Sequence, residues 1–122
     1  MIKTLTILLL FISSFSVNAQ STELLNGKWL FKRALNTEVD TEGQKVLNSQ
    51  VINKMTFEFK SNREFIGFVI GRNTKGKWSL SKESKIVILD TLDGKIEFAI
   101  LKLTETELIL KLGLGEFLMK KI

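Results

Sequence analysis

The sequence predicts an all-β domain, an eight-stranded antiparallel up-and-down barrel that follows an N-terminal signal peptide. Apolar residues recur at every second position far more often than at the helical period, which indicates half-buried strands. The apolar blocks are separated by short runs of Gly, Asn, Asp or Ser, which favour turns between neighbouring strands. Closing these strands into a barrel removes the edges that a flat sheet would expose. A two-sheet sandwich is the alternative, but it normally needs longer crossover connections.

Residues 1–19 have the organisation of a signal peptide. Lys3 precedes a mostly apolar run from Leu5 to Phe15, which is shorter than the roughly 20 residues that a membrane span needs. Val17-Asn18-Ala19 then supplies the small residues of a cleavage site. The alternative is a buried N-terminal strand or helix. We expect residues 1–19 to be removed and residues 20–122 to form one exported domain, either periplasmic or secreted.

The first half of this domain begins with a short helical turn, predicted at 21–25. The strand at 27–31 follows, with Gly, Trp and Phe on one face and Lys on the other. Residues 35–50 are polar and are predicted to form a long loop. The block at 55–60 is the cleanest half-buried strand. The next block, 65–70, carries apolar residues at both parities, so the sequence leaves its inward face open.

The second half contains five further strands, predicted at 76–80, 86–89, 96–103, 108–112 and within 113–122. Asp93-Gly94 is a strong signal for a two-residue hairpin turn before the third of them. Beyond that turn, Phe98 and Ile100 alternate inward, whereas Leu101 and Leu103 have the opposite parity. A β-bulge near Ile100 would reconcile the two patterns.

Both tryptophans lie in the same tripeptide, Gly-Lys-Trp. The residues around the two copies share no further pattern, so recurrence of strand geometry is favoured over duplication. Gly27 lets the chain bend into a barrel at low steric cost, and Trp29 can close one end of the core. Direct contact between Trp29 and a ligand is the less favoured interpretation. The role of Trp78 is less clearly indicated by the sequence, and Trp78 is a candidate to line an internal cavity.

A Gly-x-Trp in the first strand, just after a helical turn, resembles the motif by which lipocalins are recognised. "LNGKW" carries this motif, and the second "GKW", "MTFEF" and "ILKLTETELIL" are similar to small lipocalin-like domains of exported bacterial proteins. The resemblance implies a calycin-type β-barrel in which a basic side chain, Lys120 or Lys121, packs over the ring of Trp29. The sequence departs from larger lipocalins because it has no Tyr, no disulfide and no room for a C-terminal helix.

The composition argues against several other classes of function. His and Cys are both absent, which rules out Ser-His or Cys-His catalysis and zinc sites built on those ligands. The net charge is +5 and the basic residues are scattered, which does not favour nucleic-acid binding. No cysteine is available as a lipid acceptor at the cleavage site. We therefore predict no enzyme, no metal, no cofactor and no stable membrane insertion after cleavage.

Eight strands enclose an interior that is either filled by side chains or able to hold one small ligand. The first hypothesis is a binding module for a small hydrophobic molecule. Its cavity would open near the 35–50 loop and be lined by Phe57, Phe59, Phe65, Trp78 and Phe98. The second hypothesis is a filled barrel that acts as a structural or interaction protein at the cell envelope. The sequence does not indicate which partner or oligomeric state applies.

Two weaker candidates concern charged clusters. The 35–50 loop contains three acidic side chains that faintly resemble a calcium loop but lack the length of an EF-hand: Glu38, Asp40 and Glu42. A second cluster, expected in one turn, is basic and could hold an anionic ligand or glycan: Arg72, Lys75 and Lys77. A solvated hairpin tip is the favoured interpretation of this second cluster.

Overall fold

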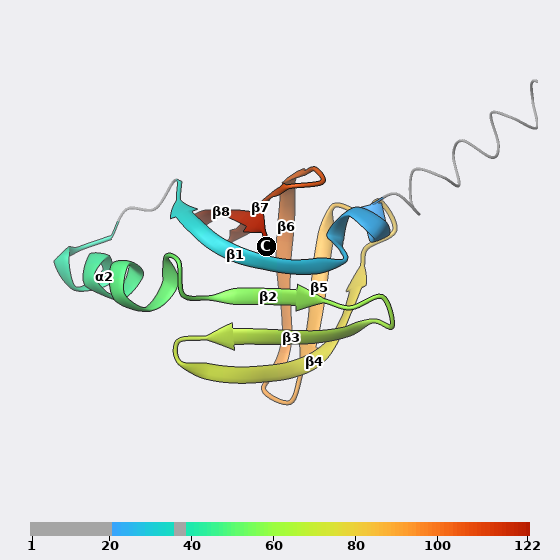
Figure 1. The fold of residues 1–122 in the computed structure, drawn as a ribbon, viewed down its shortest axis with the longest axis horizontal. Helices are drawn as coiled ribbons and strands as arrows, with labels where there is room; N and C mark the ends of the chain where they lie inside the picture. The colour runs from blue at the N-terminus through green and yellow to red at the C-terminus, as the bar shows by residue number, and fades with distance from the viewer. Residues whose placement is uncertain (1–20, 36–38) are drawn as a thin grey trace, which may run out of the picture.

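The computed structural model describes residues 21–35 and 39–122, so the predicted signal peptide lies outside the described residues. Eight antiparallel strands pair in sequence order, and the first pairs with the last to close a barrel (Figure 1). The strands are β1 (Gly27–Ala34), β2 (Thr56–Phe59), β3 (Glu64–Val69), β4 (Arg72–Leu80), β5 (Ile86–Thr91), β6 (Gly94–Leu103), β7 (Glu107–Leu112) and β8 (Gly115–Lys121). This arrangement confirms the predicted fold class and excludes the sandwich.

Alternation of apolar and polar residues places the core as the sequence predicts. Trp29 and Phe31 in β1, and Phe57 and Phe59 in β2, are buried inside the barrel. In β3 both faces carry apolar residues, and the inward face is the one with Phe65. This face also includes Gly67 and the half-buried Val69. No polar or charged residue is buried in the part of the chain that the structure describes.

The 35–50 segment differs from the predicted loop. It contains a helix, α2 (Thr41–Val46), which continues into a π-helical turn, η1 (Leu47–Val51). Asp40 caps α2, because its carboxylate accepts a hydrogen bond from the backbone N–H of Gly43 at 2.8 Å. The segment is anchored at its end, where Val51 is buried. Leu47 and Ile52 also pack against the core, half-buried. Because α2 itself is polar and these contacts come only after it, the segment lacks the periodicity that a sequence pattern detects.

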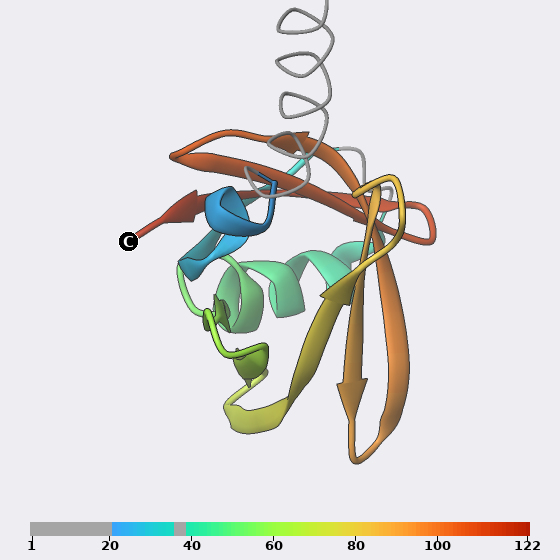
Figure 2. The same cartoon turned by 90° about the vertical axis from the view of Figure 1, so that its right-hand side faces the viewer.

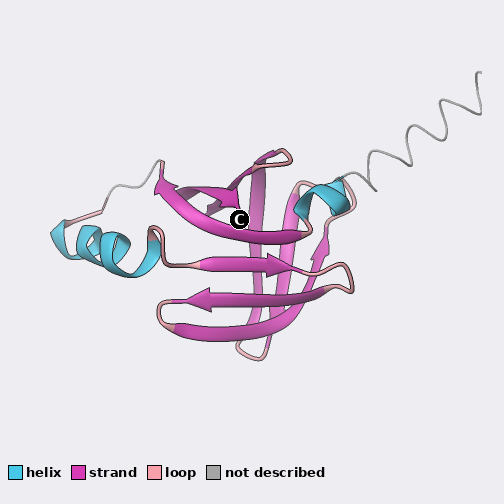
Figure 3. Ribbon diagram, viewed as in Figure 1, coloured by secondary structure: helices cyan, strands magenta, loops and turns pink. Residues whose placement is uncertain are grey.

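Two helical segments mark the two ends of the barrel. Residues 21–25 form the predicted helical turn before β1, and α2 lies at the opposite end (Figures 1 and 3). Viewed from the side of the helical turn, α2 is framed by the surrounding strands (Figure 2). Within the described residues, no helix is long and apolar enough to cross a membrane.

The register of β6 contains the predicted β-bulge. Its pairing with β7 shifts between Ile100 and Lys102, which lets both Ile100 and Leu103 pack against the core. Leu101 sits at the bulge and stays exposed. A second shift, between Phe31 and Arg33 in the β1–β8 pairing, has no signal in the sequence.

The hairpin between β5 and β6 is shifted by one residue from its predicted turn. Thr91 pairs with Gly94, so Leu92 and Asp93 form the tip and Gly94 is the first residue of β6. Gly94 has a φ of +118°, a conformation that a side chain would strain. The predicted glycine is therefore required, but its place is just after the tip.

Candidate functional site

One end of the barrel is closed around Trp29. The indole Nε1 donates a hydrogen bond to the carbonyl of Leu25, in the helical turn, at 2.9 Å. Lys121 lies over the ring with its Nζ 4.9 Å from the ring centroid, and the same Nζ donates to the carbonyl of Leu24 at 3.0 Å. Gly27, with a φ of +132°, leaves room for this lysine, because a Cβ there would lie 3.1 Å from Lys121 Cε. Trp29 thus ties the first and last strands to the helical turn.

Lys120 occupies a different position from Lys121. Its Nζ lies 3.4 Å from a carboxylate oxygen of Glu107, on the outer face. The other Glu107 oxygen accepts a hydrogen bond from Lys102 at 2.8 Å. Lys121 is therefore the residue that the structure places over the ring.

Trp78 is held in the same way as Trp29. Its Nε1 donates to the carbonyl of Lys60 at 2.9 Å, and the guanidinium carbon of Arg63 lies 4.6 Å from the ring centroid. The ring packs against Phe59, with centroids 5.5 Å apart. A Cβ on Gly76 would collide with the carbonyl oxygen of Asp90, so the glycine lets β4 and β5 approach closely. Both Gly-Lys-Trp copies are therefore built into strand contacts and packed aromatic rings.

A cavity of about 420 Å³ occupies the other half of the barrel and opens at the α2 end. Its lining comes from all eight strands, from two hairpin tips and from the segment around η1: Phe31, Val51, Met55, Phe57, Phe65, Val69, Ile70, Thr74, Leu89, Thr91, Asp93, Ile96, Phe98, Leu112 and Phe117. Pockets of this size with predominantly apolar walls are typical of small-molecule sites. The interior is thus filled at one end and hollow at the other.

The floor of this cavity is a cluster of edge-to-face aromatic rings centred on Phe57. Its ring centroid lies 5.0 Å from that of Phe31, 5.1 Å from Phe65 and 5.7 Å from Phe98. Such pairs are stabilising beyond their burial, by about 0.5–1.5 kcal/mol each. The cluster separates the cavity from the closed end and gives it a rigid base.

The comparisons with known proteins concern the fold. No protein-family model and no curated protein matches the sequence. A lipocalin-like protein from Bacteroides uniformis superimposes with a TM-score of 0.58 at 16% identity, covering 81% of this chain and 99% of the other. The chain has a lipocalin-like fold. An uncharacterized protein from Bacteroides eggerthii gives a TM-score of 0.61 at 11% identity, covering 80% of this chain and 99% of the other.

The lipocalin-like barrel brings together three of the five residues predicted to line its cavity: Phe57, Phe65 and Phe98. Phe59 and Trp78 do not line it. They pack against one another at the closed end, on the far side of the Phe57 ring. Alternation shows which residues point inward but not at which level of the barrel they lie, so it could not separate these two from the other three.

Other lining residues were missed because their signals are local. Phe31 and Phe117 face one another across the β1–β8 closure, with ring centroids 5.6 Å apart, and that closure joins distant parts of the sequence. Ile70 was assigned to the predicted strand at 65–70, whose inward face the sequence left open, but β3 ends at Val69 and Ile70 lies in the following turn. Val51 lies directly after the predicted loop at 35–50, and it is the last residue of η1, a helical turn that the sequence did not predict.

Among the described residues of the lipocalin-like barrel that line the cavity, three have polar side chains: Thr74, Thr91 and Asp93. The hydroxyl of Thr91 is used within its own turn, where it donates to the carbonyl of Gly94 at 3.0 Å and accepts from the N–H of Asp93 at 3.2 Å. Thr74 and the carboxylate of Asp93 remain as groups that can meet a ligand at the mouth. The cavity therefore suits an apolar body with a polar end.

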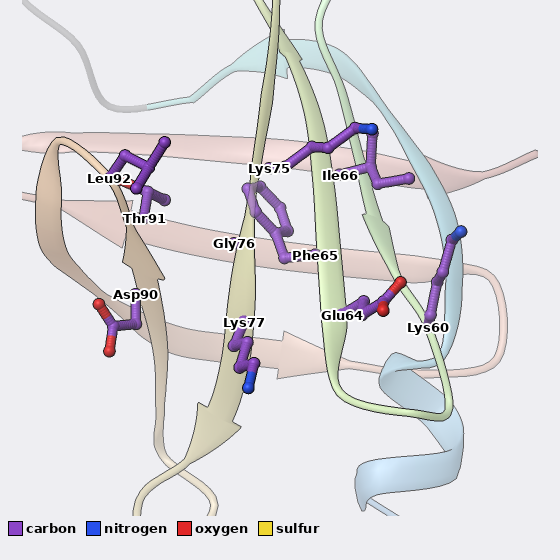
Figure 4. Close-up of a pocket in the computed structure, with 10 residues that line it drawn as sticks. All are labelled: Lys60, Glu64, Phe65, Ile66, Lys75, Gly76, Lys77, Asp90, Thr91 and Leu92. Carbon is purple, nitrogen blue, oxygen red and sulfur yellow. The ribbon is translucent and has the colours of Figure 1, made fainter.

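A second hollow of about 600 Å³ lies on the outer wall, over β3, β4 and β5 (Figure 4). Lysine and glutamate or aspartate side chains surround it, and Phe65 and Thr91 line both this hollow and the internal cavity. Its charged residues are Lys60, Glu64, Lys75, Lys77 and Asp90. Charges of both signs make this wall a mixed polar surface, not a dedicated anion site.

The charged clusters predicted from the sequence are not assembled as expected. Arg72, Lys75 and Lys77 lie along β4 instead of in one turn, because the turn is formed by Ile70 and Gly71. Of the acidic loop, Glu38 lies outside the described residues and Asp40 is the cap of α2. Residues 21–35 and 39–122 contain no group of three or more side chains placed to hold a metal ion.

Proposed function

We propose that this protein is an exported binding module whose barrel holds one small, mostly apolar molecule. The observation that carries the proposal is the cavity of about 420 Å³ at the open end of the barrel. Eight-stranded barrels of this kind are able to hold a single small ligand. Export rests on the predicted signal peptide at 1–19, and we expect a protein that is periplasmic or secreted.

The lining indicates the chemistry of the ligand. Its body would pack against the ring faces and edges of Phe57, Phe65 and Phe98. Asp93 is the one charged residue among those that line the described cavity, and its carboxylate accepts hydrogen bonds. A hydroxyl or amine end is therefore favoured over a carboxylate end, which Asp93 would repel.

Binding, not catalysis, is the activity that this cavity supports. Two hydroxyls and one carboxylate at its mouth offer no nucleophile paired with a base, and Thr91 is engaged in its turn. The walls are predominantly hydrophobic, as in carriers of small apolar molecules.

A pair of substitutions on one strand tests the proposal. Thr74→Phe places a ring inside the cavity, whereas Asn73→Phe adds the same ring to the outer face of β4. We expect Thr74→Phe to weaken binding of a fluorescent hydrophobic probe by about tenfold or more, since it removes contact area from the ligand. Asn73→Phe should bind as the unmodified protein does. Equal probe binding by both variants would contradict an internal site.

A reproducible small-molecule mass on the protein, found by native mass spectrometry after gentle purification, would identify the ligand. Mass spectrometry of the same sample also tests export, because cleavage after Ala19 predicts Gln20 as the first residue. If neither the purified protein nor the protein incubated with a lipid extract carries any ligand, the alternative function applies: a structural or interaction protein at the cell envelope.

A further inference from the structure

The hairpin tips around the mouth of the cavity carry exposed apolar side chains. Ile70 is 53% exposed at the β3–β4 tip, Leu92 is fully exposed at the β5–β6 tip, and Leu114 is 90% exposed at the β7–β8 tip. All three hairpins meet at the mouth, because Ile70, Asp93 and Leu112 line the same cavity. We call Ile70, Leu92 and Leu114 the apolar rim.

The turns at the closed end have a different composition. They consist of Ser, Asn and Arg at 61–63, of Ser, Lys and Glu at 81–85, and of Thr and Glu at 104–106. A large apolar side chain in solvent does not stabilise the folded barrel, and tight turns favour Gly, Asn, Asp and Ser. The apolar rim is therefore specific to the end of the barrel where the cavity opens.

Ile70 adds a second observation, because its backbone conformation is unfavourable. Its φ is +48° and that of Gly71 is +76°, so the two form a turn that normally takes Asn-Gly. A β-branched residue in the left-handed region is a steric outlier. Its side chain lies at the mouth, with one part lining the cavity and about half of it in solvent. Strain of this kind clusters at functional sites, so it marks the tip at the mouth as one.

Basic side chains stand directly behind the apolar tips. Arg72 lies two residues after Ile70, Lys95 three residues after Leu92, and Lys111 three residues before Leu114, and all are exposed. Acidic residues lie beside the same tips: Asp93 is at a tip, and Asp90 and Glu116 pair in register with Lys95 and Lys111. Arg72 lies opposite Val69, so its charge faces no carboxylate in that register, and the whole chain carries a net charge of +5. Single apolar side chains beside Arg72, on a chain of net positive charge, match the interface of an anionic lipid bilayer, which takes apolar groups below its charged headgroups.

We propose that the mouth of the barrel docks onto an anionic lipid bilayer, with the apolar rim inserted at the headgroup level. The rim residues stand on separate tips around an opening, and a fluid interface accommodates them individually. Docking in this orientation lets an apolar ligand pass between the bilayer and the cavity without crossing water. This transfer step rests on the proposed binding function, whereas docking itself does not.

Vesicle co-sedimentation of the full chain tests the docking surface. The vesicles are phosphatidylcholine alone, or an equal mixture of phosphatidylcholine and phosphatidylglycerol. We expect binding to the anionic vesicles that weakens with added salt, by about fivefold for each cation that loses its contact. The rim variant Leu92→Asn/Leu114→Asn should lose about tenfold or more in affinity, since each leucine leaves the interface.

A matched variant controls for the loss of apolar surface. Leu101 and Ile122 are also exposed apolar residues, but they lie toward the closed end, so Leu101→Asn/Ile122→Asn should bind vesicles normally. Equal loss in both variants, or retention in the rim variant, would overturn docking by the mouth. A protein that self-associates through the rim and ignores vesicles would overturn it as well, because a second copy would then be the occupant.

Probe binding in solution separates this proposal from the function on which its transfer step rests. The rim variant should still bind the hydrophobic probe, because Leu92 and Leu114 do not line the cavity. Probe binding without vesicle binding would overturn docking and leave the binding module intact. Vesicle binding without any probe binding would support docking and overturn the binding module, and the transfer step with it.

Discussion

Lys121 of β8 lies over the indole ring of Trp29 in β1, with its ammonium nitrogen 4.9 Å from the ring centroid. The same nitrogen donates to the carbonyl of Leu24, so one side chain joins the two strands that close the barrel to the helical turn before them. Lys120, its neighbour in sequence, faces outward toward Glu107. The two adjacent lysines therefore have separable roles.

Lys121→Met removes the charge and keeps an apolar stem. We expect it to lower the free energy of unfolding by about 1–2 kcal/mol, through loss of the cation–π contact and of one hydrogen bond. Lys120→Met removes only an exposed ion pair and should cost less than about 1 kcal/mol. Urea denaturation of both variants measures the difference. A larger loss in Lys120→Met would contradict the assignment of Lys121 as the anchor.

Trp78→Phe tests the separation between the closed end and the cavity. The substitution leaves the carbonyl of Lys60 without its donor and removes part of a buried ring, so we expect a loss of about 2–4 kcal/mol in stability. Probe affinity should stay unchanged in the folded variant, because Trp78 does not line the cavity. A weakened probe affinity at a temperature where the variant is fully folded would place Trp78 in the binding site after all.

Ile70→Asn should make the protein more stable and less able to bind vesicles. Asn tolerates the left-handed conformation that Ile70 adopts, so we expect a gain of about 1 kcal/mol in the free energy of unfolding. Gly71→Ala is the backbone control: it introduces a side chain at a φ of +76° in open space and should destabilise by a similar amount. Stability is read from thermal melts, and vesicle affinity from co-sedimentation. A destabilised Ile70→Asn would show that the tip is not strained.

The lowered pKa of Glu107 predicts that the stability of the protein depends on pH. Its pKa lies below the ordinary value of about 4.5, chiefly because Lys102 donates a hydrogen bond to it and secondly because Lys120 does. A carboxyl whose pKa is lowered on folding stabilises the protein above its unfolded pKa, and this contribution disappears as the pH falls through the folded pKa. We therefore expect Glu107→Gln to flatten the acid side of the stability profile below pH 4.5. Glu105→Gln, in the adjacent turn, serves as the control and should leave that profile unchanged.

Alternation along the sequence accounts for most of the fold. The period of two reveals which residues are inward in β1, β2, β4 and β7, and the parity conflict around Ile100 locates a real bulge in β6. The α2–η1 segment was not predicted because α2 is polar and contact with the core is made by Leu47 and Val51 of η1, which show no helical period by themselves. The face of β3 stayed open because Ile66 and Phe68 are apolar on the outer wall, where no local pattern marks them as exposed.

The candidate site was predictable only in part, for a geometric reason. Whether a barrel is filled or hollow depends on which rings meet across it, and these come from strands that are distant in sequence. Phe57 contacts Phe98 and Phe31, whereas Phe59, two residues along the same strand, contacts Trp78 at the other level of the barrel. Sequence patterns cannot resolve that difference in level. The sequence did not indicate the apolar rim either, since residues at hairpin tips are normally expected to be polar and exposed to solvent.

The pairing of β1 with β8 has a consequence for the order in which the molecule can assemble. The ladder that closes the barrel joins residues near Trp29 to residues near Lys121, so it cannot form until β8 has emerged from the ribosome. Long-range pairing of this kind is slow, because the intervening chain must be ordered before the closing contacts are gained. A chain that we propose is exported benefits from this delay, since translocation through a membrane channel requires an unfolded polypeptide. In such a protein, late pairing of β8 would keep the new chain unfolded until it has been translocated.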